Sequence, residues 1–326
     1  MTGQRVWRLG GGRSVALDRP RLVAVMNVTP DSFSDGGEVE SAEAAAARAR
    51  ALESAGADAL DIGGESTRPG AERVDGAEQI RRVVPAIRAI RDAGVSLPIS
   101  VDTTLAAVAE AGLAAGCDGV NDVSGGEESG FDVARLAAER GAGLVLMHRV
   151  RPPDEDVYSD AYTVEPSFGP GDDTEPPVVG FVRRALADRA ARAMELGVRG
   201  SALVLDPGLG FGKSVPQNLA LMRYAGSIES GALEAGAAGV LWGASRKSFV
   251  GRVTGVEDPS LRGAGSAAMA CAVVGGGGLL FRVHDVRLHR EALDAAWAVI
   301  GPDAARSGEA ERKAGGSGHG VASTGG

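Results

Sequence analysis

Eight short apolar runs recur along the chain, and each of them ends in a small group of polar residues. The runs lie at residues 22–28, 59–63, 97–101, 119–123, 143–147, 202–205, 239–242 and 279–283. They are apolar throughout and do not alternate with polar residues, which is typical of parallel strands covered by helices. Eight strand and helix units in a row predict a closed TIM (β/α)8 barrel in place of a doubly wound sheet.

The segments between these runs have the period of amphipathic helices. We expect helices at residues 41–56, 77–93, 105–115, 131–140, 178–196, 217–228, 263–274 and 285–300. For the first of them, Ser41 is placed as an N-cap and Gly56 as a C-terminal stop.

The pattern changes at both ends of the chain and once in its middle. Residues 1–20 hold two short apolar stretches around Gly10–Gly12, which predicts a hairpin that closes the bottom of the barrel. Residues 21–300 then form a single barrel domain, interrupted by a proline-rich, acidic excursion at 150–177. From 301 to 326 the chain has no large apolar residues, so we expect a disordered tail.

The net charge and the positions of the cations limit the kind of ligand that the protein is expected to bind. The 326 residues carry a formal net charge of −9, which argues against a nucleic-acid surface. Cations nevertheless follow several of the predicted strands, at Arg68, Arg246, Lys247 and Arg282. An acidic protein that keeps cations at one mouth is expected to bind a small anion such as a phosphate ester.

The expected compartment is the cytoplasm. No apolar run approaches the roughly 20 residues of a membrane helix, so we expect no membrane association. Residues 1–8 lack the apolar core of a signal peptide. Cys117 and Cys271 both lie in apolar, alanine-rich stretches, and we interpret them as buried thiols in a reducing compartment.

Three apparent motifs fail on spacing or context. Gly212-Lys213-Ser214 ends like a phosphate-binding P-loop, but the first glycine of that motif would fall on Pro207. Residues 263–268 fit the dinucleotide-binding glycine pattern, yet no strand precedes them. His284 and His289 lack the spacing and the neighbouring ligands of a zinc site.

Carboxylates end three of the predicted strands, at Asp61, Asp102 and Asp206. Any one of them alone is equally well explained as the N-cap of the following helix. Three that face one mouth, together with Asn121, favour a ligand with several N–H donors, because a carboxylate accepts two parallel hydrogen bonds from a planar fork.

The remaining candidates also have ordinary alternatives. Asn27 is either a ligand or a turn residue that bonds its own backbone, Arg68 either a binding cation or a surface residue, and Lys247 either a ligand or a solvated helix start. Arg282 and His284 flank Val283 in the last strand, so both point the same way. With Arg68 they would suit the charged ends of a diphosphate.

Three motifs together resemble one family. The segments 27–37, 63–70 and 282–286 stand at the ends of the first, second and last strands. In this order they resemble the dihydropteroate synthases, folate-pathway enzymes that join 4-aminobenzoate to a pterin diphosphate. The resemblance extends from about residue 22 to residue 286 and implies the same barrel fold.

The resemblance implies a role for each candidate. The pterin would be bound by Asp102, Asn121, Asp206 and Lys247, the diphosphate by Asn27, Arg68, Arg282 and His284, and the aminobenzoate by Phe33, Thr67, Pro69, Phe211 and Ser248. Mg²⁺ would bridge the diphosphate and Asn27. The loops 28–37 and 66–71 would close over both substrates. The family also suggests a homodimer.

In such an enzyme the diphosphate leaves first, and the aromatic amine captures the resulting pterin cation. No protein nucleophile is needed, and catalysis would be electrostatic, through Asp102, Lys247, Arg282 and His284. A pterin-binding methyltransferase that serves a corrinoid protein would keep the carboxylates but would not need the diphosphate cations. A catalytically inactive paralogue is the other alternative. The fifth strand end at His148-Arg149 and the acidic excursion depart from the family pattern, and we expect both to affect only the entrance.

Overall fold

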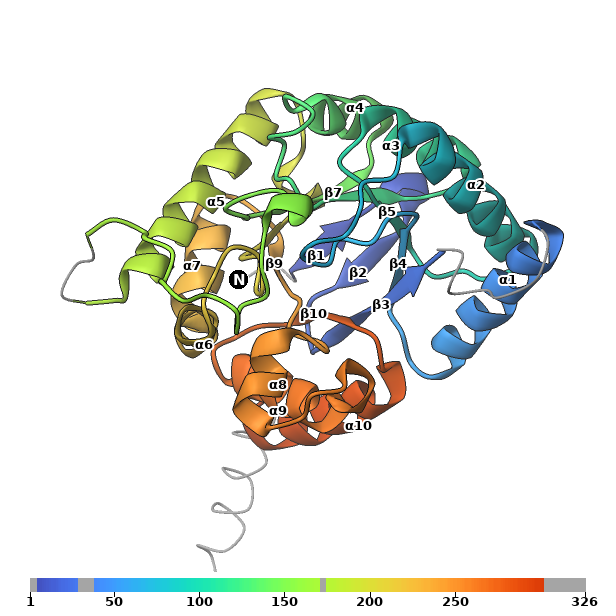
Figure 1. Ribbon diagram of the computed structural model, residues 1–326. Coiled ribbons are helices and arrows are strands. Elements are labelled where there is room, and N and C mark those ends of the chain that lie inside the picture. Colours follow the sequence, from blue (N-terminus) through green and yellow to red (C-terminus); the bar gives the residue numbers. More distant parts are fainter. Residues whose placement is uncertain (1–4, 29–37, 171–173, 302–326) are drawn as a thin grey trace, which may run out of the picture.

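The computed structural model describes residues 5–28, 38–170 and 174–301, and eight of its strands form a closed barrel (Figure 1). The strands are β3 (Arg21–Asn27), β4 (Ala59–Gly63), β5 (Ile99–Asp102), β6 (Gly119–Asp122), β7 (Gly143–Met147), β8 (Leu203–Asp206), β9 (Gly239–Trp242) and β10 (Leu280–Val283). All neighbouring pairs are parallel, and β10 pairs with β3 to close the ring. The predicted (β/α)8 barrel is confirmed.

Helices surround this barrel (Figure 1). They are α1 (Glu38–Ser54), α2 (Gly76–Asp92), α3 (Ala106–Ala115), α4 (Asp132–Arg140), α5 (Pro177–Glu195), α6 (Val215–Arg223), α7 (Ala225–Glu234), α8 (Ser248–Thr254), α9 (Gly263–Gly275) and α10 (Val286–Ile300). These helices cover the outer face of the sheet; α7 follows α6 directly, and α8 and α9 both lie between β9 and β10.

Three details of the predicted helices were wrong. The single helix expected at 217–228 is two helices, because Tyr224 leaves helical geometry (φ −98°, ψ 29°) and α7 then continues to Glu234. The first helix begins at Glu38, so Ser41 lies inside it and is not its N-cap. Helix α8 was not predicted, since seven residues are too few to show a period.

Along each strand, successive side chains alternate between the inside of the barrel and its outer face. Outward residues such as Leu60, Ile62 and Leu205 pack against the helices in the main apolar core. Inward residues of the lower barrel, such as Val145 and Val204, form a second apolar cluster with the N-terminal segment.

That N-terminal segment is a hairpin of β1 (Val6–Arg8) and β2 (Ser14–Ala16), as predicted. The indole Nε1 of Trp7 donates a hydrogen bond to the carbonyl of Ala202 at 3.1 Å, at the start of β8. Leu9 lies over Gly143, where an added Cβ would come within 3.1 Å of its side chain. The hairpin therefore closes the lower end of the barrel, where the strands begin.

The segment between β7 and α5 is irregular over its described residues 148–170 and 174–176, apart from one 3-10 turn at Pro153–Glu155. Most of the predicted tail, residues 302–326, lies outside the described part of the chain. Among the described helices, none combines the length and the apolar composition that a membrane crossing requires.

Candidate active site

The upper half of the barrel interior is polar, because the same inward-facing positions that are apolar below carry polar side chains above. Ala59 is followed two positions on by Asp61, Val204 by Asp206, and Leu280 by Arg282. The other polar residues at inward positions near the strand ends are Asn27, Ser100, Asp102 and Asn121. Polar side chains from six strands, β3, β4, β5, β6, β8 and β10, therefore meet inside one mouth.

Arg282 is the centre of this group. Its Nε donates to Asp61 Oδ2 at 2.7 Å, and its Nη2 donates to Asp102 Oδ2 at 2.7 Å. Asp61 also accepts from Ser100 Oγ at 2.6 Å and from Asn121 Nδ2 at 3.0 Å. Asp61, a strand-end carboxylate with no ligand assigned to it from the sequence, thus orients three of the surrounding side chains.

The floor of the site presents hydrogen-bond acceptors. Among the described residues, Asp102 Oδ1 and Asn121 Oδ1 are buried and have no partner. Asp206 uses Oδ1 to accept from the backbone N–H of Gly208 at 2.7 Å, which leaves Oδ2 toward the barrel axis. Buried acceptors without donors are unfavourable, so a ring with several N–H groups would stabilise this floor.

Burial raises the pKa of Asp102 to about 7, although the neighbouring Arg282 opposes the shift. Burial also raises the pKa of Asp206. For Arg282, burial lowers the pKa, but Asp61 and Asp102 outweigh it and the pKa is raised. One guanidinium serves two buried carboxylates, so Arg282 compensates the burial of Asp102 only in part.

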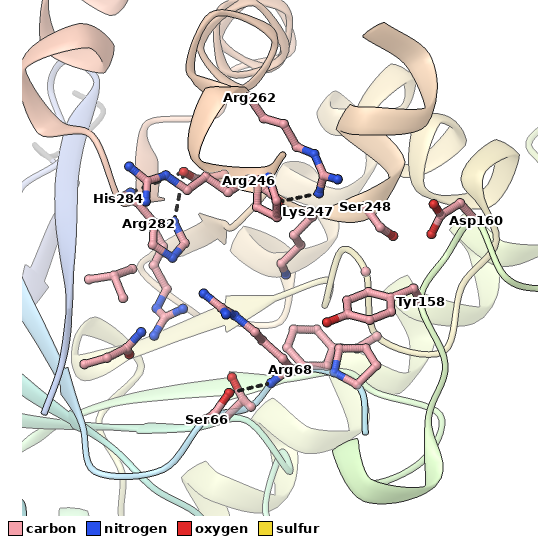
Figure 2. Close-up of a pocket in the computed structure, with 18 residues that line it drawn as sticks. Ser66, Arg68, Tyr158, Asp160, Arg246, Lys247, Ser248, Arg262, Arg282 and His284 are labelled. Atoms are coloured by element: carbon pink, nitrogen blue, oxygen red, sulfur yellow. Dashed lines mark hydrogen bonds between the residues drawn. The ribbon is translucent and has the colours of Figure 1, made fainter. Parts of the chain in front are cut away.

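A cavity of about 280 Å³ opens above this floor (Figure 2). The residues predicted from the sequence that line it are Asn27, Thr67, Arg68, Pro69, Phe211, Lys247, Ser248, Arg282 and His284. The predicted pterin ligands Asp102, Asn121 and Asp206 do not line this cavity. Asp102 is bonded to Arg282, which does, and Asp206 Oδ2 and Lys247 Nζ converge near Gly243. Phe33 lies outside the described residues.

Lys247 connects the floor to the cavity. Its Nζ donates to the carbonyl of Leu209 and lies 4.3 Å from the centroid of the Phe211 ring. Burial lowers its pKa to about 8, with Asp206 opposing the shift. A Cβ added at Gly243 would come 3.8 Å from Lys247 Nζ, 3.9 Å from Asp206 Oδ2 and 4.0 Å from Arg282 Cβ, so these groups converge on one point.

His284 enters the cavity from the end of the last strand. Burial, with Arg282, Arg246 and other nearby cations, lowers its pKa to about 3, so the ring is neutral at neutral pH. Its Nδ1 lies 3.1 Å from Ser245 Oγ. The ring therefore lines the cavity as a neutral hydrogen-bonding group, and its predicted contact with a diphosphate stays a prediction.

Several cavity residues were not predicted as ligands. Arg246 was noted only as a strand-end cation, but it lines the cavity and adopts a left-handed backbone with φ 63°, a strained conformation for arginine. Arg262 donates to the carbonyl of Arg246 at 3.0 Å. Tyr158 and Asp160 come from the excursion, so the expectation that it affects only the entrance was incomplete.

The P-loop-like residues have a different use. Lys213 is fully buried, and its Nζ donates to the carbonyls of Gly208 and Phe211 at 2.9 Å and of His148 at 3.3 Å. The ammonium therefore holds the loop after β8 against the end of β7 and does not face a phosphate. Residues 263–268 lie in α9, which follows a 3-10 turn and not a strand.

The mouth of this barrel combines hydrogen-bond acceptors at its floor with cations along its wall. Such a site is that of an enzyme that binds a ring with several N–H donors and an attached anionic group. The family model described as pterin binding enzyme matches residues 23–284. The chain is 39% identical to a dihydropteroate synthase of Neisseria meningitidis over 91% of its own length and 98% of the relative's.

Solved structures of dihydropteroate synthases are also similar to this chain. A Xanthomonas albilineans dihydropteroate synthase with 4-aminobenzoic acid superposes with a TM-score of 0.76 at 40% identity, over 91% of this chain and 99% of that one. The same enzyme in complex with 7,8-dihydropteroate gives 0.73 at 38% identity, over 90% and 99%. The chain belongs to the dihydropteroate synthase family.

The raised pKa of Asp102 makes the stability of the fold depend on pH. Its folded pKa, about 7, lies above the ordinary value of 3.8, so between these values the folded state holds a proton that the unfolded state has lost. This contribution is complete below pH 3.8 and is lost as the pH rises toward 7. We expect urea titrations of Asp102→Asn to show a free energy of unfolding that falls less between pH 4 and 7, by at most about 1.4 kcal/mol per pH unit. An unchanged slope would show that Asp102 does not bind this proton.

Proposed function

We propose that this protein is a dihydropteroate synthase that condenses 6-hydroxymethyl-7,8-dihydropterin diphosphate with 4-aminobenzoate, giving 7,8-dihydropteroate and diphosphate. One observation carries this proposal. In the mouth of the barrel, the buried acceptors Asp102 Oδ1 and Asn121 Oδ1 have no donor, and a cavity lined by several cations lies next to them. A pterin ring supplies N–H donors to the first, and its diphosphate supplies negative charge to the second.

The pterin would lie on the floor. Asp206 would accept from its 2-amino group and N3–H, as a carboxylate accepts from a planar fork. Asp102 Oδ1 and Asn121 Oδ1 would accept from the other edge, which gives both atoms the partner they lack. Lys247 Nζ, at the same convergence point, would donate to the ring carbonyl and ring nitrogen.

The diphosphate would lie in the cavity. Arg68 enters it from the loop after β4, while His284 and Arg246 lie across from it (Figure 2). Arg282 uses two of its nitrogens on carboxylates, and Nη1 has no partner within the described part of the chain, so it is available to a phosphate oxygen. A bound dianion would raise the pKa of His284 by offsetting the cations that now lower it.

The residues present fit Mg²⁺ only as a shared ion. The described residues hold no cluster of three or more His, Cys, Asp or Glu that would bind a metal alone. Asn27 places an amide at the cavity wall, and Mg²⁺ accepts one or two protein oxygens when phosphates and waters supply the rest. With the diphosphate bound, Mg²⁺ would be held by Asn27 and would neutralise charge on the leaving group.

The arylamine would occupy the outer part of the cavity. Phe211 and Pro69 offer apolar walls for an aromatic ring, and Thr67 and Ser248 offer polar groups at the rim. Phe33 belongs to this proposal too, on the resemblance alone, since it lies outside the described residues.

The chemistry would be a substitution at the exocyclic methylene of the pterin. The C–O bond breaks and its electron pair leaves with the diphosphate, toward Arg68 and Arg282. Positive charge on the pterin is stabilised by the carboxylate of Asp102, in a site where burial strengthens electrostatic interactions. The amine nitrogen then forms the C–N bond and loses a proton to the released diphosphate or to water.

The alternative functions fit less well. A corrinoid-linked methyltransferase would use the acceptor floor, but the cation cluster around the cavity would have no purpose. An inactive paralogue is disfavoured because the described chain keeps every residue to which a role is given above, apart from Phe33.

The proposal includes a homodimeric assembly and a cytoplasmic location. We infer a homodimer, for which the strongly exposed apolar side chains of Val253, Leu261 and Val299 near α8 to α10 are candidate contacts. Light scattering would measure the mass. We also place the reaction in the cytoplasm, in keeping with two free cysteines in the described chain.

The direct test is turnover by purified protein with the pterin diphosphate, 4-aminobenzoate and Mg²⁺. We expect dihydropteroate to form, and Lys247→Ala and Asp206→Asn each to lower kcat/KM at least about 100-fold, the loss for two or three kcal/mol of transition-state binding. Thermal melting is the control: both side chains lie outside the apolar clusters and are proposed to bind the pterin, so their variants should unfold near the wild-type temperature. Absence of product from the wild type would refute the function, and collapsed melting would make these residues structural.

The metal proposal has its own test. Calorimetry with inorganic pyrophosphate should show tighter binding with Mg²⁺ than with EDTA, by about tenfold for an interaction of roughly 1.4 kcal/mol. Asn27→Ala should lose most of this gain and keep the metal-free affinity. Equal affinities with and without Mg²⁺ would remove the metal from this site.

The order of binding should follow from the loop that carries Arg68 and Pro69. If the diphosphate fixes this loop, 4-aminobenzoate binds weakly to the empty protein and at least about tenfold more tightly with pterin and pyrophosphate present, a coupling of roughly 1.4 kcal/mol. Arg68→Ala should reduce this coupling more than it reduces pterin affinity. Tight binding to the empty protein would show a preformed pocket.

A further inference from the structure

The excursion after β7 forms one wall of the substrate cavity. Tyr158 and Asp160 line the cavity together with Arg68, Phe211 and Lys247. Figure 2 shows the hydroxyl end of Tyr158 directed into the cavity, while Asp160 stands at its edge. No sequence motif marks this tyrosine, and the chemistry proposed above does not use it.

Buried polar contacts attach this wall to the loop after β8. Asp156, only 5% exposed, accepts from the backbone N–H of Gly212 at 2.7 Å. Its other oxygen accepts from Tyr162 Oη at 2.6 Å and from the N–H of Val157 at 2.9 Å. These bonds fix the backbone on both sides of Tyr158.

Further bonds hold the same segment from below and from the side. Ser159, 4% exposed, accepts from Asn218 Nδ2 at 3.0 Å. The carbonyl of Pro153 accepts from the N–H of Gly70 at 2.8 Å, next to the residues proposed to contact the arylamine. The excursion therefore connects the loop of Arg68 to the loop of Phe211.

Tyr158 itself contributes little to the fold. It is 47% exposed while Asp156 and Ser159 around it are buried, and its hydroxyl has no hydrogen-bond partner among the described residues. A rigid backbone thus presents an aromatic ring with a free polar tip to a cavity. Such a side chain offers a large contact area at small entropic loss, as tyrosine does in recognition sites.

We propose that Tyr158 is a specificity-determining residue of the arylamine subsite, where its ring packs against the aromatic ring of the second substrate on the side open to solvent. This inference rests on the proposed function. Phe211 and Pro69 would cover the inner side of that ring, and Tyr158 would complete the enclosure.

The test is steady-state kinetics in which each substrate is varied separately. Tyr158→Ala should raise KM for 4-aminobenzoate about fivefold, the size expected for one lost aromatic contact, and leave KM for the pterin diphosphate within about twofold. Tyr158→Phe keeps the ring and should stay within about twofold of wild type for both substrates. The matched control is Val157→Ala, a similarly exposed neighbour outside the cavity lining.

Each other outcome has a defined meaning. An unchanged KM for 4-aminobenzoate in Tyr158→Ala, or an equal rise for both substrates, would overturn the assignment while wild-type turnover still supports the function. A wild type without turnover would refute the proposed function and this role with it. Melting temperatures equal to wild type are expected, because the ring is half exposed, and they exclude misfolding as the cause.

Discussion

One guanidinium between two buried carboxylates is the interaction on which the rest of the site depends. Arg282, on β10, bridges Asp61 and Asp102 on the neighbouring strands β4 and β5, and Asp61 in turn accepts a hydrogen bond from Asn121. Without the arginine, two carboxylates would be buried without compensation, at a cost of about 3–5 kcal/mol for a broken buried pair. Asp102 and Asn121 each keep one oxygen without a hydrogen-bond donor. The network that compensates the buried charges therefore also leaves acceptors available to a ligand.

The two-residue period of the strands lets the barrel serve stability and binding at once. Along β8, Val204 belongs to the lower apolar cluster, and Asp206, two positions later, belongs to the floor of the site. The change from apolar to polar occurs at about the same height in neighbouring strands. A shift of one residue in any strand would turn its polar residue toward the helices, so strand register and the site are specified together.

Much of this could be predicted from the sequence, because continuous apolar runs and strand-end residues are local patterns. The eight strands, the hairpin and the residues around the mouth follow from them. The break at Tyr224, the neutral His284 and the place of Tyr158 could not be predicted. Each depends on packing, on burial among cations, or on hydrogen bonds between segments distant in sequence, and none of these leaves a periodic signal.

The hairpin at the bottom of the barrel constrains how the chain assembles during synthesis. Trp7 bonds the carbonyl of Ala202, and Arg5 pairs with Glu229 at 2.9 Å, so partners of the first described residues are made some two hundred residues later. Until then the hairpin has only part of its partners, such as Val23 and Val145, and contacts this distant form late. The beginning of the chain is therefore among the last parts to be secured, and its docking would mark completion of the barrel.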